Sequence, residues 1–302
     1  MFKNVIVGVD GRPGGRDAIA LASQLTDPDA TITLVHVHPG TPRQSGALSP
    51  AAREEREASE RLLQQERAST GIDAALSSSM ALRPARGLHE LAEEKSADLL
   101  VVGSCSRGPV GQVMSGDDTL AALNGAFCAV AVAVSGYAEH ARPIAKVGVG
   151  CNSTPESKAA LAVARRIAAA TDASVHALEV IEIPSYAHAG LVSPVSRETV
   201  DEIVEEADNR MASLKANTGV KGLPDVHGSA VHGLPGEQLA ALGGEMDLLV
   251  VGSRSYGPFQ RMMLGSTSDY LEHHARCSLL VLPRTRASVS ERSTPTPLPA
   301  SA

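Results

Sequence analysis

Aromatic residues are almost absent from this chain of 302 residues. Phe, Trp and Tyr together make up 2% of it, and Trp does not occur. Hydrophobic residues nevertheless account for 43% of the chain, so the core has to be built from Val, Leu, Ile and Ala. The scarcity of aromatic rings also removes the stacking platforms on which single-stranded nucleic acids bind.

Blocks of positive charge are missing as well. The formal net charge is −7 at pH 7, and neither half of the chain contains a run of Lys and Arg. Because proteins bind DNA and RNA largely by neutralising phosphates, we expect no nucleic-acid partner.

The chain has no long hydrophobic run. Its longest apolar stretch, residues 126–134, is much shorter than the about 20 residues that cross a bilayer. The first four residues, 1–4, lead directly into an apolar strand, so we expect no leader segment. We therefore expect a soluble, cytoplasmic protein with no membrane partner.

Cysteine is sparse and unpaired in the sequence. The chain contains Cys105, Cys128, Cys151 and Cys277, with no CxxC motif. In a chain of this length, reduced thiols are a better interpretation than a disulfide framework or a metal site. His36 and His38 share one face of a strand, but no acidic or Cys cluster completes a ligand set, so we expect no metal site.

A duplication dominates what is present. Residues 98–109 read DLLVVGSCSRGP, residues 247–258 read DLLVVGSRSYGP, and a later glycine keeps the same offset in both copies. Each half, of about 140 residues, is long enough to bury its own core. We predict a first domain over 1–136, a linker over 137–146, a second domain over 147–284 and a disordered Ser/Thr/Pro-rich tail over 285–302.

Short apolar runs alternate with helical patterns in both halves. The predicted strands are 5–9, 31–37, 74–82, 99–102 and 129–134, then 147–150, 175–181, 226–231, 248–251 and 278–282. This alternation predicts an α/β protein made of two tandem, doubly wound, five-stranded parallel sheets of Rossmann-like type.

The loop after the fourth strand of each half is typical of phosphate-binding architecture. A buried strand is followed by a Gly/Ser/Pro loop and a helix start, where glycine-freed amides and the helix dipole favour an anion. Gly-Ser or Gly-Asp before a helix is also an ordinary cap. No GxxxxGK[ST] loop occurs and no GxGxxG follows a strand, so those two nucleotide motifs are not supported.

Taken together, the loops, their spacing and the duplication resemble the universal stress protein family in its tandem two-domain form. The resemblance covers nearly the whole chain except the tail, and it implies the strand order 3-2-1-4-5 in each half. ATP-binding members carry Gly, two residues, Gly, nine residues, Gly and then Ser or Thr. The second half keeps this spacing with Gly252, Ser255, Gly265 and Ser266.

The resemblance also assigns residues to the ligand. In the second half, the phosphates would be surrounded by Gly252, Ser255, Gly257, Gly265 and Ser266, with Arg254 near them. Asn152 stands where the family has an Asp at the adenosine end, and it keeps hydrogen-bonding capacity without the charge.

The first half departs from the pattern in a different place. It keeps the acid as Asp10, and the corresponding loop residues are Gly103, Ser106, Gly108 and Gly116. Asp117 then replaces the hydroxyl residue. A carboxylate at ~4 Å from a phosphate charge is repelled by about 4 kcal/mol at an effective dielectric of ~20. This half should bind ATP more weakly, unless Mg²⁺ bridges the two groups.

The resemblance implies an adenine-nucleotide-binding stress-response protein whose ligand is ATP, with or without Mg²⁺. It would act by a ligand-linked change of conformation or assembly, and we assign no catalytic residue. Two alternatives stay open: a slow ATP hydrolase or adenylyl transferase in the same cleft, and a nucleotide-free interaction scaffold. The last strands, 129–134 and 278–282, could pair between halves as a pseudo-dimer or between chains as a homodimer.

Overall fold

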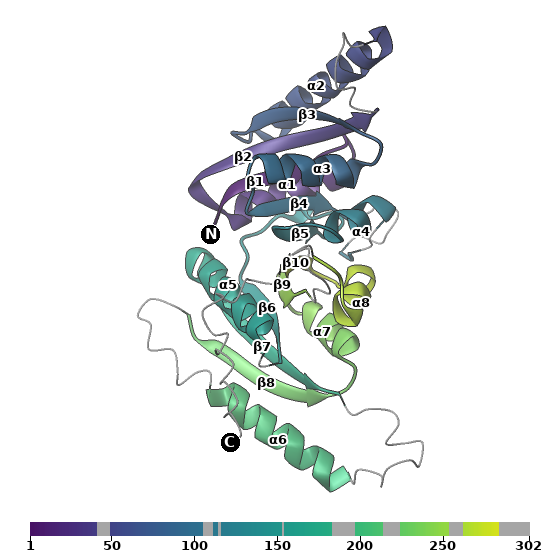
Figure 1. The fold of residues 1–302 in the computed structure, drawn as a ribbon. Helices are drawn as coiled ribbons and strands as arrows, with labels where there is room; N and C mark the ends of the chain where they lie inside the picture. The colour runs from purple at the N-terminus through teal and green to yellow at the C-terminus, as the bar shows by residue number, and fades with distance from the viewer. Residues whose placement is uncertain are drawn as a thin grey trace, which may run out of the picture.

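The computed structural model describes residues 1–40, 49–104, 111–113, 116–152, 154–182, 197–213, 224–253 and 262–283. These residues form one ten-stranded sheet with helices on both faces (Figure 1). The predicted disordered tail, residues 285–302, lies outside the described residues.

The two halves contain the same succession of elements. The first half comprises β1 (Phe2–Gly8), α1 (Pro13–Leu25), β2 (Thr26–Pro39), α2 (Pro50–Thr70), β3 (Ala75–Ala81), α3 (Pro84–Glu94), β4 (Leu99–Gly103), α4 (Asp117–Leu123) and β5 (Ala129–Ala133). A 3₁₀ turn, η1 (Ala138–His140), lies in the linker. The second half comprises β6 (Lys146–Cys151), α5 (Pro155–Thr171), β7 (Ser174–Ile181), α6 (Arg197–Ser213), β8 (Val226–His232), α7 (Pro235–Gly243), β9 (Leu248–Gly252), α8 (Ser266–His274) and β10 (Ser278–Leu282).

The strand order confirms the predicted fold class. Across the sheet the order is β3-β2-β1-β4-β5-β10-β9-β6-β7-β8, so each half has the order 3-2-1-4-5. Within each half all neighbouring strands are parallel. Such strands are joined by helical crossovers, which is why the apolar runs and the helical patterns alternate in the sequence.

The two halves are joined through their last strands. β5 and β10 pair antiparallel, with Leu280 opposite Ala131 in the centre of the register. The side chain of Ser278 also accepts a hydrogen bond from the Val134 amide, at 3.3 Å. Of the two pairings that the sequence left open, the structure therefore has the one between halves of the same chain.

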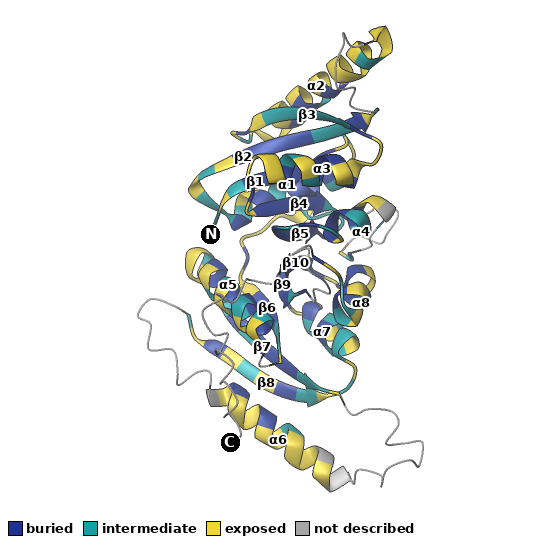
Figure 2. Ribbon diagram, viewed as in Figure 1, coloured by how far each residue is buried: buried dark blue, intermediate teal, exposed yellow. Residues whose placement is uncertain are grey.

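The core consists of two aliphatic layers, one on each face of the sheet. Alternate residues of a strand enter different layers, as Val5 and Val7 do on one face and Ile6 on the other. Helices α1, α2, α5 and α6 cover the first face, and α3, α4, α7 and α8 cover the second. Figure 2 shows the strands as the most buried part and the outer surfaces of α2 and α6 as exposed. Both layers run through the β5–β10 joint.

Two matched aspartates fasten the strand starts together. Asp98, just before β4, accepts hydrogen bonds from the amides of Lys3 and Asn4 at 2.9 and 3.0 Å. Asp247, just before β9, accepts the equivalent bonds from the amides at 145 and 146, both at 2.9 Å. The duplication seen in the sequence therefore extends to side-chain contacts.

None of the described helices is both long and apolar enough to cross a membrane.

We expect the Leu280→Ala substitution to destabilise the protein strongly. Leu280 is fully buried in the middle of the joint, and truncating such a leucine costs about 2–5 kcal/mol in unfolding free energy. The matched control is Leu82→Ala, because Leu82 is 70% exposed and its truncation should change stability by less than about 0.5 kcal/mol. Urea denaturation measures both. Equal midpoints for the two variants would contradict the buried joint.

Candidate functional site

The candidate clefts lie at the carboxyl ends of adjacent central strands. In the first half β1 neighbours β4, and in the second half β6 neighbours β9. The helices that follow these strands cover opposite faces of the sheet: α1 and α4 in the first half, α5 and α8 in the second. The chain therefore leaves neighbouring strands toward opposite faces, which is the arrangement at which open α/β sheets bind their ligands.

The first cleft begins with a turn built around Asp10. Its Oδ1 accepts a hydrogen bond from the Arg12 amide at 3.1 Å. The Arg12 guanidinium lies 3.6 Å from Oδ2, and both side chains are largely exposed. The ring of His36, from β2, donates through Nδ1 to the Val9 carbonyl at 2.8 Å. The end of β1 is thus fixed, while the carboxylate of Asp10 stays accessible to a ligand.

The start of α1 presses directly on the end of β4. A Cβ on Gly103 would lie 2.1 Å from the Gly14 carbonyl oxygen, and a Cβ on Gly14 would lie 2.8 Å from the Ser104 carbonyl oxygen. Only glycine fits at either position without a shift of the backbone. The Thr119 hydroxyl, in the first turn of α4, donates to the Gly103 carbonyl at 3.1 Å. Three backbone segments therefore meet at this point.

Both helices that follow the fourth strands begin after glycine. The N-cap residues are Gly116 for α4 and Gly265 for α8, and both have extended backbones. Because glycine has no side chain, neither N-cap residue satisfies the first-turn amides. Ser266 is the first residue of α8, and Ser268, which is matched to Thr119, is buried. The start of α8 therefore combines first-turn amides that have no side-chain cap with a hydroxyl side chain, a combination suited to an anion.

The second cleft differs from the first at its first turn. The side-chain oxygen of Asn152 accepts hydrogen bonds from the Thr154 hydroxyl at 2.7 Å and from the Thr154 amide at 3.4 Å. The Thr154 hydroxyl oxygen in turn accepts from the Ser157 amide at 3.3 Å. The oxygen of Asn152 is therefore engaged in the turn that caps α5. Within the described residues, Asp10 bonds only to its own turn and keeps an exposed carboxylate.

Glu156 is a site residue that the sequence analysis missed. It lies in the first turn of α5, and a Cβ on Gly252 would lie 2.9 Å from the Cβ of Glu156. Its counterpart in the first half is Gly14, since both follow a helix-opening proline. Superposing the two repeats beyond the loops could have revealed this exchange. The second half thus has an acidic residue whose Cβ lies against the end of β9.

The structure describes part of the predicted site. Placed at the carboxyl edges of the two halves are Asp10, Gly103, Gly116, Asn152, Gly252, Gly265 and Ser266. Outside the described residues lie Ser106, Gly108, Arg254, Ser255 and Gly257. Asp117 is the first residue of α4, as the sequence predicted.

The segment ahead of each of these helices is bonded to the opposite half. The Val113 amide donates to the Ala275 carbonyl at 2.8 Å, and the Met262 amide donates to the Ala126 carbonyl at 2.7 Å. Val113 is matched to Met262 in the duplication, as Ala126 is to Ala275, so the exchange is reciprocal. Each phosphate-type loop therefore ends on the other half of the protein.

Further bonds strengthen this exchange. The Met262 carbonyl accepts from the Gly125 amide at 2.8 Å, and the Asn124 side chain accepts from the Leu264 amide at 3.2 Å. From the other side, the Gln112 side chain donates to the His273 carbonyl at 3.1 Å. The start of α8 is therefore positioned by residues that follow α4 in the first half.

An unusual buried acid lies in α8. Glu272 is fully buried and occupies the place that Leu123 takes in α4. The His273 ring nitrogen Nδ1 lies 3.4 Å from its Oε1, but within the described residues neither carboxylate oxygen has a hydrogen-bond partner. Burial raises the pKa of Glu272 to about 7. The folded protein therefore holds a proton on this side chain well above the usual carboxyl range.

The cysteines and histidines form no further site in the described part of the chain. Cys128, Cys151 and Cys277 are free, and burial raises the pKa of each thiol to about 12. Across the described ranges, no group of three or more His, Cys, Asp or Glu side chains is arranged to hold a metal ion. Cys105 lies outside these ranges.

Comparison with known proteins gives the family. The model of the universal stress protein family matches residues 1–133 and again residues 143–283. The chain belongs to the universal stress protein family. The two matches coincide with the two five-stranded halves, so this universal stress protein has the tandem form.

Individual relatives agree with this assignment. A universal stress protein of Mycobacterium tuberculosis is 30% identical over 188 residues, which cover 61% of this chain and 61% of the relative. One from Thermus aquaticus is 32% identical over 136 residues, which cover 43% of this chain and 93% of the relative. The match thus spans about three-fifths of the length of the mycobacterial protein.

Solved structures show the same fold. The crystal structure of a universal stress protein from Archaeoglobus fulgidus has a TM-score of 0.65 at 18% identity, covering 93% of this chain and 98% of that one. A protein from Pseudomonas aeruginosa, described as functionally unknown, has a TM-score of 0.60 at 15% identity, with 93% of both chains covered.

We expect the unfolding free energy of the Glu272→Leu variant to increase relative to that of the wild type as the pH rises. In the wild type, the folded pKa of about 7 lies above the model value of 4.5, so the unfolded chain releases this proton first. The unfolding free energy therefore falls between about pH 4.5 and pH 7, by at most about 3 kcal/mol. Leucine, the residue of the first half, removes this loss. Urea denaturation at about pH 5 and pH 8 measures the difference.

The control for this experiment is Glu205→Leu, because Glu205 is an exposed residue of α6. Its effect on stability should not change between the two pH values. A constant stability difference between Glu272→Leu and the wild type would show that Glu272 ionises normally in the folded protein.

Proposed function

We propose that this universal stress protein binds an adenine nucleotide, ATP, at the carboxyl ends of its central strands. The observation that carries the proposal is the start of α8, where Gly265 leaves the first amides without a side-chain cap beside the hydroxyl residue Ser266. Two further observations support a site at the carboxyl ends of the central strands. The chain belongs to the family, and Gly252, at the end of β9, contacts the first turn of α5.

The two ends of the nucleotide would contact different groups. The triphosphate fits the start of α8, because the amides and the helix dipole favour negative charge. The adenosine end fits the turn after β6 or β1. In the first half, the exposed carboxylate of Asp10 is an acceptor for ribose hydroxyls. In the second half, the oxygen of Asn152 already accepts from Thr154, so its amide NH₂ is the group left for the ligand.

Each cleft also has an acidic residue in the first turn of an adjacent helix. In the first half it is Asp117 at the start of α4, and in the second half it is Glu156 at the start of α5. Carboxylates and phosphate oxygens are the ligands that Mg²⁺ uses in proteins. We therefore expect ATP to bind more tightly with Mg²⁺ than without it, in both halves.

Ligand binding would act through the contact between the halves. Nucleotide that orders the loop of one half also favours one position of residues 111–113 or 262–264, which are bonded to the other half. A ligand shifts a conformational equilibrium by its difference in affinity for the two states. The hydrogen bonds exchanged between the halves would transmit a conformational change from one cleft to the other half. Such coupling fits a cytoplasmic stress-response protein better than a dedicated enzyme.

Exchanging the two helix-opening residues tests the nucleotide site. Ser266→Asp places a carboxylate at the start of α8 and should weaken binding in the second half about tenfold or more, which is about 1.4 kcal/mol. Asp117→Ser removes the carboxylate from α4 and should strengthen binding in the first half. Calorimetric titration with ATP in the absence of Mg²⁺, where no cation bridges the carboxylate and the phosphates, measures affinity and stoichiometry per chain. The control is Ser49→Asp, because Ser49 is the exposed N-cap of α2, a helix that follows neither β1 nor β4.

Two outcomes would replace the proposal. If the purified protein releases no nucleotide on denaturation and Mg-ATP produces neither heat nor a thermal shift, the chain is a nucleotide-free scaffold. If ATP is consumed beyond one turnover per site, the cleft belongs to a slow hydrolase or transferase.

The exchange between the halves has its own test. Asn124→Ala removes the side chain that accepts from the Leu264 amide, so the start of α8 should loosen and ATP affinity in the second half should fall several-fold. Hydrogen exchange of residues 262–264 should become faster. The control is His273→Ala, at the matched position, whose side chain bonds to Asp269 within its own helix. Equal effects of both variants on ATP binding would argue against coupling through Asn124.

A further inference from the structure

A cavity lies where the linker crosses onto the second half. Its volume is about 330 Å³, and its lining includes Val134, Tyr137, His140, Arg142, Met246 and Arg276. It sits at the amino end of β9 and the carboxyl end of β5, away from the proposed nucleotide cleft of the second half, which is at the carboxyl end of β9. Its edge of the sheet is the one that carries the proposed cleft of the first half, and Gly111 belongs to the loop of that cleft.

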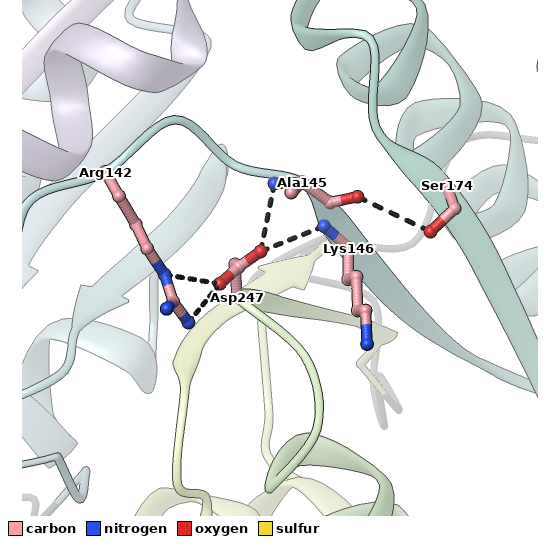
Figure 3. A network of polar contacts seen from close by, with 5 residues as sticks. All are labelled: Arg142, Ala145, Lys146, Ser174 and Asp247. Carbon is pink, nitrogen blue, oxygen red and sulfur yellow. Dashed lines mark hydrogen bonds and ion pairs between the residues drawn. The ribbon is translucent and has the colours of Figure 1, made fainter.

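The walls of this cavity are held by two aspartates, Asp17 and Asp247. Asp17 of α1 is 3% exposed and accepts hydrogen bonds from the amides of Gly136 and Ala138 at 2.9 and 2.7 Å. Asp247 accepts from the amides at 145 and 146 at the other end of the linker (Figure 3). The Gly111 amide also donates to the Ser135 carbonyl at 2.9 Å. The cavity is therefore preformed, which lowers the cost of ordering it around a ligand.

The charge of the cavity is positive although the chain is acidic. Asp247 is the acidic residue among the described lining residues, and both of its oxygens are engaged. Oδ1 accepts from Arg142 through Nε at 3.2 Å and Nη2 at 2.9 Å, and Oδ2 accepts the two linker amides (Figure 3). Arg276 has no hydrogen bond or ion pair with any other described residue. Its guanidinium is available to an anion, and His140 lines the same cavity.

The remaining wall is apolar. Val134, the ring of Tyr137, Met246 and Cys277 form it. A volume of 330 Å³ is at the lower end of the about 300–1,000 Å³ of small-molecule sites, so the occupant has to be compact. The first half offers no matching cation, because its residue at the position of Arg276 is Phe127.

We propose that this cavity binds a small organic anion: a compact apolar body with one carboxylate, which pairs with the Arg276 guanidinium. An arginine and a carboxylate form two parallel charge-assisted hydrogen bonds, and the apolar body fills the space between Tyr137 and Met246. The bound anion would contact the linker and the second half together.

Benzoate is the probe for this site, and benzamide is the matched neutral compound. We expect benzoate to shift the backbone NMR signals of Gly111, Ser135 and Gly136 in the full chain, with saturation below about 10 mM, as expected for a fragment with a Kd of ~1 mM. Benzamide should bind at least about tenfold more weakly, and Arg276→Gln should weaken benzoate binding by about tenfold or more. The control variant is Arg86→Gln, an exposed arginine of α3.

Three results would overturn the proposal. The first is the absence of saturable shifts with benzoate. The second is equal binding of benzoate and benzamide, and the third is unchanged benzoate binding in an Arg276→Gln variant whose thermal midpoint matches the wild type. The Arg276→Gln variant distinguishes this cavity from the proposed nucleotide cleft of the first half, because Gly111 belongs to the loop of that cleft and Arg276 does not.

Discussion

The antiparallel pairing of β5 with β10 is the interaction on which the rest of the structure depends. It merges two five-stranded sheets into one and lets both aliphatic layers continue across the joint, with the small Ala131 opposite the large Leu280. Because the strands of one half run against those of the other, their carboxyl ends lie at opposite edges of the sheet. Ligands in the two clefts would therefore not touch, and any communication between them has to pass through protein.

Much of this fold follows from the sequence, for a physical reason. Strands buried on both faces appear in the sequence as uninterrupted apolar runs, such as residues 99–102 and 248–251. Because the chain is duplicated, each element can be predicted independently from both halves. The positions of Asp10, Gly103 and Gly265 at strand ends and helix starts could be predicted for the same reason, since parallel strands place their carboxyl ends together.

What the sequence does not reveal are contacts that depend on how the elements pack. Glu156 reads as an ordinary first-turn acid until Gly252 is found against it. Glu272 reads as a polar residue of an amphipathic helix, although the packing buries it where Leu123 stands in the other half. The bonds from Val113 to Ala275 join residues that are far apart in the chain, and no local pattern records such a pairing.

The joint also limits how this chain can assemble. Both sides of β5 and both sides of β10 are occupied, so neither strand can receive a strand from a second copy. The sheet ends at β3 and β8, the two strands that have a single neighbour each. Continued growth of the sheet from chain to chain would have to begin at the small polar residues of β3 or at β8, where α6 packs so closely on Gly228 that a Cβ there would lie 2.3 Å from the Met211 carbonyl oxygen. By pairing its own halves, the chain has buried the two edges through which it would otherwise polymerise.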